Sequence, residues 1–271
     1  GGVSLAGAML PLYLLLAMLQ RQIHWVEPLE FAEGLSAAAA YLVPAFTCGY
    51  AILCAMAVWG YLCNSRSAGM MHALPVDRTC LFATGVLSGL AMILIPYAVT
   101  GGLLGLIALF CGAFHLTAVV TTVLTVAFAA VLFFGMATLC AMLTGHALVL
   151  PVFYLLANFL AHLMEMLVIS LAEDFLLGVW MTQDMGMLGF LSPVMQIYRS
   201  VRPVAERLPD GTLTGWRLQG LWVLGLYALA GLALLALAWY LYRRRRSESA
   251  GDVVAFRWLR PVFRYGLALL S

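Results

Sequence analysis

The stretch LALLALAWYLYRRRR at residues 232–246 decides the class of fold. Its first part is apolar on every face of a helix, whereas a strand of a membrane barrel would alternate polar and apolar residues. With the largely apolar residues back to 218, the run is long enough for a helix to cross a hydrocarbon core of about 30 Å. We therefore predict a transmembrane helix over 218–242, which ends where four arginines reach the membrane surface.

Five further apolar stretches of comparable length precede this one in the chain. They occupy residues 3–19, 35–62, 81–110, 116–143 and 149–172. Hydrophobic residues make up 64% of the 271 residues and charged residues only 10%, against about 25% charged residues in a soluble domain. This composition excludes a soluble enzyme, a nucleic-acid binder and a disordered tail. The sequence predicts an all-α membrane protein whose six transmembrane helices occupy residues 1–242.

The positions of the arginines predict how these six helices are oriented. All 14 basic residues are arginines, and short cytoplasmic loops are enriched in basic residues. If residues 243–246 are cytoplasmic, alternation places loops 63–80 and 144–148 on the same side. That side then carries nine arginines against three acidic residues, and the outer side carries five against eight. We therefore expect a multi-pass membrane protein with both termini in the cytoplasm.

Residues 243–271 are expected to form a basic amphipathic segment on the inner membrane surface, because apolar and basic residues recur there at helical spacing. The expected anchors to anionic lipids are Arg243, Arg244, Arg245 and Arg246. The chain begins at Gly1 and stops in apolar residues at its other end. We therefore expect it to be a piece of a longer protein.

Two outer segments differ in character. Loop 20–34 is predicted to be short and acidic. Segment 173–217 contains apolar patches at 175–180 and 185–198, which are typical of short helices that dip into the outer leaflet or of a surface loop with anchoring aromatic residues. Both interpretations stay open. Pro-Asp-Gly at 209–211 predicts a turn.

The cytoplasmic segment between the second and third spans has a possible apolar helix face. Met70, Met71 and Leu74 recur at helical spacing, and Pro75 ends the pattern. Such an element lies across the ends of the spans. It would serve either as an interfacial turn or as a docking site for a cytoplasmic partner.

The fifth predicted span, at 149–172, contains a group of polar residues. Asn158, His162 and Glu165 share one helix face, because they are four and three residues apart. Placing a carboxylate inside a bilayer costs free energy, so such a residue is by default a candidate for a functional role. It could be a polar contact between helices, part of a translocation path, or a proton or metal site.

Familiar catalytic motifs were not found in the sequence. GxxxxGK[ST], HExxH and GxSxG are absent, and these are the motifs of a phosphate-binding loop, a zinc protease and an esterase. An intramembrane hydrolase built on His162 and Glu165 would lack a nucleophile or a complete set of metal ligands. The six cysteines show no CxxC spacing and are interpreted as small apolar residues. An ion-coupled secondary transporter or channel that uses Glu165 remains an alternative.

The segment SAGMMHALPVDR at 67–78 resembles the cytoplasmic loop of bacterial ABC-2-type transporter permeases, especially a branch found in Firmicutes. In that branch a short helix leads into Ser-Leu-Pro-x-x-Arg, and here residues 73–78 read Ala-Leu-Pro-Val-Asp-Arg. Leu191-Ser192-Pro193 and the segment 247–256 are also similar to that family.

The resemblance implies a permease subunit of an ATP-binding-cassette transporter in a bacterial inner membrane, an exporter rather than an enzyme. ATP and magnesium would bind a separate cytoplasmic ATPase, so no cofactor is expected on this chain. The expected partners are that ATPase, a second permease subunit or half, and membrane lipids, with no nucleic acid. The family also has short re-entrant outer helices between spans five and six. Coupling to the ATPase is implied for Met70, Met71, His72, Leu74, Pro75 and Arg78.

Overall fold

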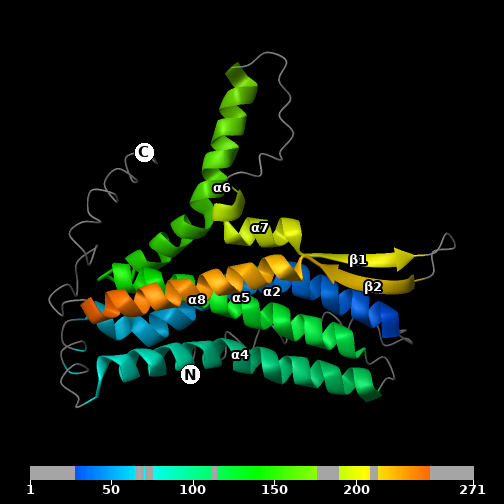
Figure 1. Ribbon diagram of the computed structural model, residues 1–271, viewed down its shortest axis with the longest axis horizontal. Helices are drawn as coiled ribbons and strands as arrows, with labels where there is room; N and C mark the ends of the chain where they lie inside the picture. Colours follow the sequence, from blue (N-terminus) through cyan, green and yellow to red (C-terminus); the bar gives the residue numbers. More distant parts are fainter. Residues whose placement is uncertain are drawn as a thin grey trace.

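Five long helices make up most of the protein (Figure 1). The computed structural model describes residues 28–64, 76–110, 115–175, 189–207 and 213–244, together with Ser67 and Met70. The long helices are α2 (Pro28–Trp59), α4 (Arg78–Phe110), α5 (Leu116–Leu143), α6 (Val149–Phe175) and α8 (Leu221–Arg244). Each is long and apolar enough to cross a membrane, which indicates a multi-pass membrane protein.

These helices confirm five of the six predicted apolar spans. The predicted stretch 116–143 coincides with α5, and α4 and α6 begin or end within three residues of their predicted bounds. The predicted span 3–19 lies outside the described residues, as does the segment after Arg244. The six-span count therefore remains a prediction.

The predicted acidic loop 20–34 is wrong over its second half. Helix α2 begins at Pro28, seven residues before the predicted span, and the short 3-10 helix η1 (Gly60–Cys63) follows its end. Proline favours the first turn of a helix because its fixed φ suits the helix and its missing N–H would have no partner there. The hydropathy pattern located the apolar part of α2 and missed its polar first turns.

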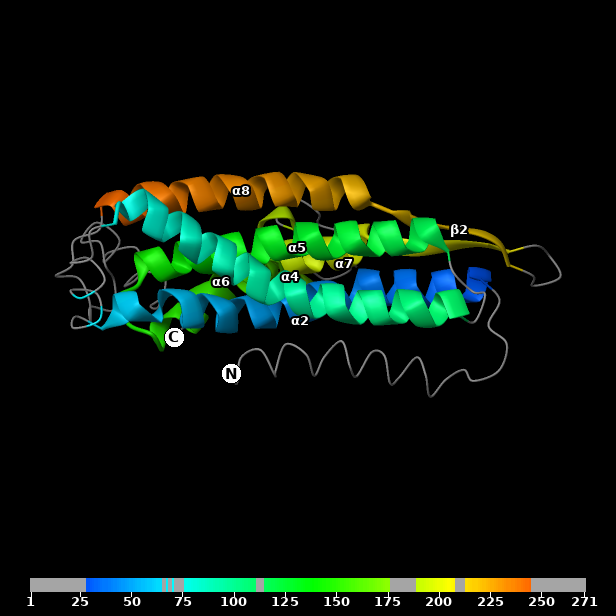
Figure 2. The same ribbon diagram turned by 90° about the horizontal axis from the view of Figure 1, so that it is seen from below.

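Helix α5 lies at the centre of the bundle. It packs most extensively against α2 and α8, and α4 contacts both α2 and α5. Figures 1 and 2 show these four helices side by side along the long axis of the molecule. The start of α4 and the end of α8 lie at one end of the bundle, where Trp59, Phe82 and Tyr242 form a buried aromatic cluster.

Glycines allow the closest contacts within this bundle. A Cβ on Gly135 of α5 would lie 2.6 Å from the main-chain oxygen of Gly231 of α8, so the two backbones touch there. The GxxxG pair of α4 packs differently, because a Cβ on Gly85 or Gly89 would meet the ring of Trp59 or Phe134. The missing side chain therefore makes room for a neighbouring backbone where α5 crosses α8, and for an aromatic ring at each of the two glycines of α4.

An antiparallel hairpin corrects the all-α prediction. Strands β1 (Arg202–Arg207) and β2 (Leu213–Gln219) pair with Arg202 opposite Gln219 and contact α2. The predicted turn at 209–211 lies outside the described residues, between these two strands. Helix α8 starts at Leu221 rather than 218, because Leu218 belongs to β2 and Gly220 follows with a φ of 84°.

Short helical elements occupy part of segment 173–217, and whether they dip into a leaflet of the membrane stays a prediction. Residues Gly189–Leu191 form the 3-10 turn η2, and Pro193–Ser200 form α7. Pro193 occupies the first turn of α7, where proline is favoured. Helix α6 extends to Phe175, and residues 176–188 lie outside the described residues.

Candidate functional site

A polar cluster lies where α6 meets η2 and α7. Figure 1 shows that the second part of α6 turns away from the other helices beside α7. At this junction the Ser192 hydroxyl donates a hydrogen bond of 2.5 Å to the main-chain oxygen of Asn158. A side chain that bonds to a helix carbonyl is one of the identifiable causes of a bend. Ser192 is fully buried, so its hydroxyl fastens η2 and α7 to α6.

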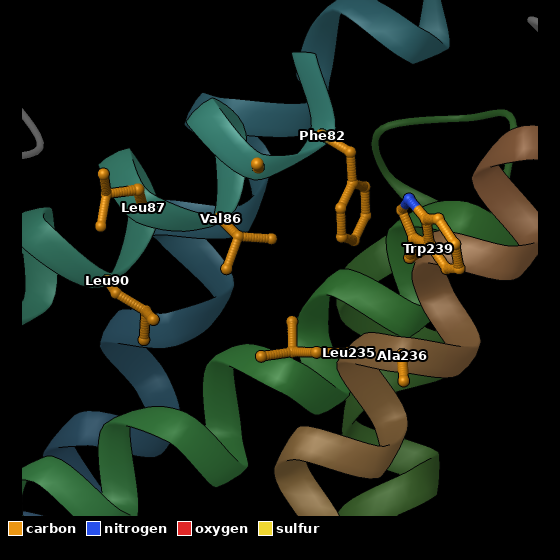
Figure 3. Close-up of a pocket in the computed structure, with 8 residues that line it drawn as sticks. Phe82, Val86, Leu87, Leu90, Leu235, Ala236 and Trp239 are labelled. Atoms are coloured by element: carbon orange, nitrogen blue, oxygen red, sulfur yellow. The ribbon is translucent and has the colours of Figure 1, made fainter. Parts of the chain in front are cut away.

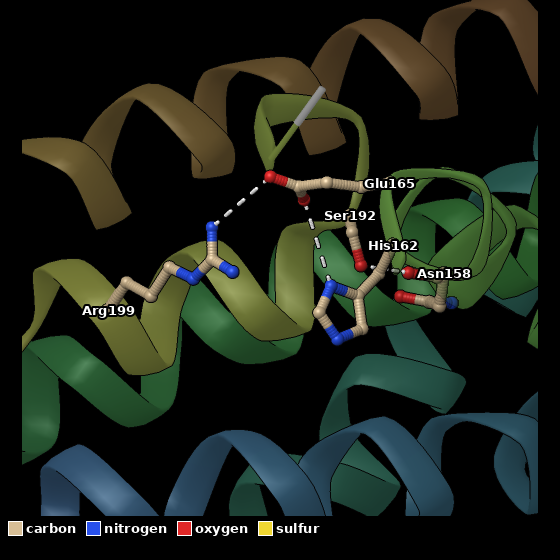
Figure 4. Close-up of polar contacts among 5 residues, drawn as sticks. All are labelled: Asn158, His162, Glu165, Ser192 and Arg199. Carbon is tan, nitrogen blue, oxygen red and sulfur yellow. Dashed lines mark hydrogen bonds and ion pairs between the residues drawn. The ribbon is translucent and has the colours of Figure 1, made fainter. Parts of the chain in front are cut away.

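Glu165 is the central residue of this polar cluster (Figure 4). Its side chain is 3% exposed, and its two carboxylate oxygens face nitrogen atoms of two different side chains. The Nδ1 atom of His162, one turn earlier on α6, lies 3.8 Å from Oε2. The Nη1 atom of Arg199 on α7 lies 3.8 Å from Oε1. The carboxylate thus joins two elements that are far apart in the sequence.

Three hydrogen-bond acceptors of the polar cluster have no donor among the described residues. Both carboxylate oxygens of Glu165 and Oδ1 of Asn158 are buried, and no described residue donates a hydrogen bond to them. The Nδ2 group of Asn158 donates instead to the main-chain oxygen of Tyr154, at 2.9 Å. Buried acceptors without donors cost free energy, so these three oxygens can accept bonds from water or from a polar ligand.

Other hydrogen bonds hold α7 and η2 in place against the bundle. Tyr198 donates from its hydroxyl to the main-chain oxygen of Tyr41 at 2.6 Å, and their rings stack. Partial burial raises the pKa of Tyr198, so the hydroxyl keeps the proton that it donates. Tyr227 of α8 donates in the same way to Phe190. The segment formed by η2 and α7 is therefore fixed to α2, α6 and α8.

The three predicted residues of α6 stand together as expected. Asn158, His162 and Glu165 lie on the side of α6 that meets η2 and α7 (Figure 4). Their role as a translocation path or as a contact between helices remains a prediction, although the Arg199 pair is such a contact. Among the described residues, no group of three His, Cys, Asp or Glu side chains is placed to hold a metal ion.

Sequence reasoning missed Ser192 and Arg199 as members of this site. Arg199 was counted among the outer charges, and Leu191-Ser192-Pro193 was noted only for a resemblance. The available signal was the need of an intramembrane carboxylate for a cationic partner. Arg199 directly follows the apolar patch 185–198. An arginine next to a patch that enters the membrane was therefore a candidate partner for Glu165.

The predicted coupling segment is described in part. Ser67 and Met70 have helical backbone, and the Met70 side chain is 70% exposed. Val76 and Asp77 are exposed, and exposed Arg78 begins α4. Outside the described residues lie the other four predicted coupling residues, Met71, His72, Leu74 and Pro75.

The predicted membrane anchors are also described in part. Arg243 and Arg244 occupy the last turn of α8, and both are exposed. The Arg243 guanidinium lies 5.1 Å from the centre of the Trp239 ring, and that of Arg244 lies 4.5 Å from the centre of the Tyr240 ring. Such cation–π contacts orient both charges along the end of the helix. Arg245 and Arg246 lie outside the described residues.

Comparison of the chain with protein-family models, curated proteins and solved structures found no match.

Proposed function

We propose that this chain is a membrane-spanning permease subunit of an ATP-binding-cassette transporter, an exporter that is driven by an ATPase on a separate chain. The observation that carries the proposal is the segment between η1 and α4, which resembles the ATPase-coupling loop of ABC-2-type permeases. Its Met70 side chain is 70% exposed at the end of an otherwise apolar bundle. Methionine is an adaptable apolar contact residue, so this position suits docking of a cytoplasmic partner.

The charge distribution supports the same orientation. Arg78 and the arginines that end α8 lie at one end of the bundle (Figures 1 and 2). Cytoplasmic ends of spans are rich in arginine, so the coupling segment would face the cytoplasm of a bacterial cell, together with both termini. A second copy or a second permease chain would complete the transport path.

The test is co-purification with the ATPase encoded beside this chain. Met70→Asp places a charge on the docking surface, and we expect it to lower both ATPase recovery and ATP-dependent export at least tenfold. Leu148→Asp is the matched control, because Leu148 is a 73% exposed apolar residue in the other loop at that end. Unchanged recovery and export with Met70→Asp would refute the docking site.

Glu165 supports a second candidate, an ion-coupled secondary transporter. A buried carboxylate that faces His162 and Arg199 has the components of a proton-coupled switch. Purified chain in liposomes distinguishes the two functions. Substrate flux driven by an ion gradient without ATP, and abolished by Glu165→Gln, would favour this second candidate.

A further inference from the structure

An apolar groove of about 490 Å³ lies between α4 and α8. Figure 3 shows Phe82 of α4 and Trp239 of α8 facing each other near one end, with Val86, Leu90 and Leu235 further along. Its volume is within the range of about 300–1,000 Å³ that is typical of ligand sites. Among the described residues that line this groove, the indole N–H of Trp239 is the one polar side-chain group, so the groove suits an occupant that is apolar along most of its length.

The groove opens on a surface that faces lipid in a membrane. Both of its walls are helices long and apolar enough to cross the bilayer, and Leu87 on its rim is 71% exposed. Lipid tails are as apolar as leucine, so burial in the groove does not by itself favour an acyl chain over its place in the bilayer. Selective binding requires a second contact, with the lipid head group.

That second contact is available at the end of the groove. Arg243 lies one helical turn beyond Trp239, which lines the groove, and its guanidinium stacks on that ring. Arg244 follows, and Arg78 begins the opposite wall at the same end of the bundle (Figures 1 and 2). Asp77 is the acidic residue next to Arg78 in the chain. Three described arginines against one described aspartate leave an excess of positive charge at the level of a lipid phosphate.

We propose that the groove between α4 and α8 binds one acyl chain of an anionic phospholipid whose phosphate is held by Arg243 and Arg244. The Trp239 ring, which lines the groove, holds the Arg243 guanidinium beside it, and Arg244 is the next residue of α8, stacked on Tyr240. Head group and acyl chain are then recognised together. Each basic residue near an anionic surface strengthens binding about five-fold. The inference depends on charge and shape at one end of the bundle, and does not depend on the proposed transport function.

The first test uses fluorescence of the full chain in vesicles. Vesicles of phosphatidylcholine contain a minor fraction of lipid with brominated acyl chains, either phosphatidylglycerol or phosphatidylcholine, because bromine quenches a tryptophan in contact. The signal of Trp239 is the difference between the unmodified chain and Trp239→Phe. We expect brominated phosphatidylglycerol to bind roughly thirty-fold more tightly than brominated phosphatidylcholine, and the double variant Arg243→Gln/Arg244→Gln to abolish that preference. Equal quenching by the two lipids of the unmodified chain would overturn the proposal.

The second test separates the groove from the arginines. Ala236 lines the groove and is exposed, so Ala236→Phe fills it without burying a new side chain in the core. Ala230→Phe is the control, at an exposed α8 position outside the lining. We expect Ala236→Phe alone to remove the preferential quenching. A preference that survives Ala236→Phe would show that the arginines act without the groove. Protection of Trp239 from both lipids, with cross-linking between copies at position 236, would show that a second copy fills it instead.

Discussion

Gly231 of α8 and Gly135 of α5 face each other where the two helices cross. A Cβ on Gly231 would lie 2.7 Å from Cα of Leu132 and 2.8 Å from the main-chain oxygen of Val131. These atoms belong to backbone, so they cannot move aside as the end of a side chain does. The absence of a side chain at this position therefore sets the distance between two helices.

Gly231→Ala should destabilise the protein by about 1–3 kcal/mol, because the added methyl group forces the two backbones apart. Gly225→Ala is the control on the same helix, since a Cβ there meets nothing within 4 Å. We expect that control to be neutral or stabilising by up to about 1 kcal/mol, because alanine favours helix over glycine. Thermal unfolding in detergent measures both. An unchanged midpoint for Gly231→Ala would contradict the close crossing.

A packing role could be predicted from the sequence for the glycines of α4, but not for the contact between Gly135 and Gly231. Gly85 and Gly89 form a local GxxxG pattern, so a packing role was predictable, although the aromatic partners Trp59 and Phe134 were not. Gly135 and Gly231 lie in no shared local motif, because their contact joins helices that are far apart in the chain. Only the arrangement of α5 beside α8 makes these two glycines a pair.

At the scale of elements, α7 connects the outer segment to α6 through charge. Arg199 is its one basic residue in the last turn and lies 3.8 Å from the buried carboxylate of Glu165. Removal of one member of a buried ion pair leaves the other without compensation, whereas removal of both is tolerated far better. The pair is therefore expected to stabilise the junction of α6 and α7.

Arg199→Gln should lower the free energy of unfolding by about 1–3 kcal/mol, less than for a fully buried pair because Arg199 is 33% exposed. The double variant Glu165→Gln/Arg199→Gln should recover most of that loss. Arg202→Gln, at an exposed position of β1, is the control for loss of an arginine. A double-mutant cycle of thermal midpoints measures the coupling. Additive effects of the two substitutions would show that the groups do not interact.

The elements show where hydropathy suffices and where it fails. The bounds of α5 followed from composition alone, because lipid requires an uninterrupted apolar run. The bounds of the hairpin did not follow from composition, since β1 and β2 are short and partly polar, and their contact with α2 joins residues far apart in the chain. A turn was predicted at 209–211, but a predicted turn alone does not show whether strands or coils flank it.

At the scale of the whole molecule, three described arginines lie together at one end of the bundle. Arg78, Arg243 and Arg244 gather at one end of the bundle, where α4 begins and α8 ends (Figure 2). The hairpin lies at the opposite end, beyond the start of α2 (Figure 1). Arginine-rich ends of spans stay in the cytoplasm. This arrangement predicts that Val76 faces the cytoplasm and that Arg202 faces the outside.

Cysteine labelling tests that orientation in a chain whose native cysteines are replaced. Val76 and Arg202 are both exposed, so a cysteine at either position is accessible to a maleimide that cannot cross the membrane. We expect Arg202→Cys to be labelled on intact cells and Val76→Cys to be labelled only after the membrane is permeabilised. The predicted cytoplasmic side carries nine arginines against three acidic residues and the other side five against eight, and the side richer in arginine is retained. The opposite labelling pattern would therefore contradict the predicted orientation. Labelling of Val76→Cys on intact cells would place the coupling segment outside the cytoplasm. A cytoplasmic ATPase could not dock there, so the proposed docking role would also be refuted.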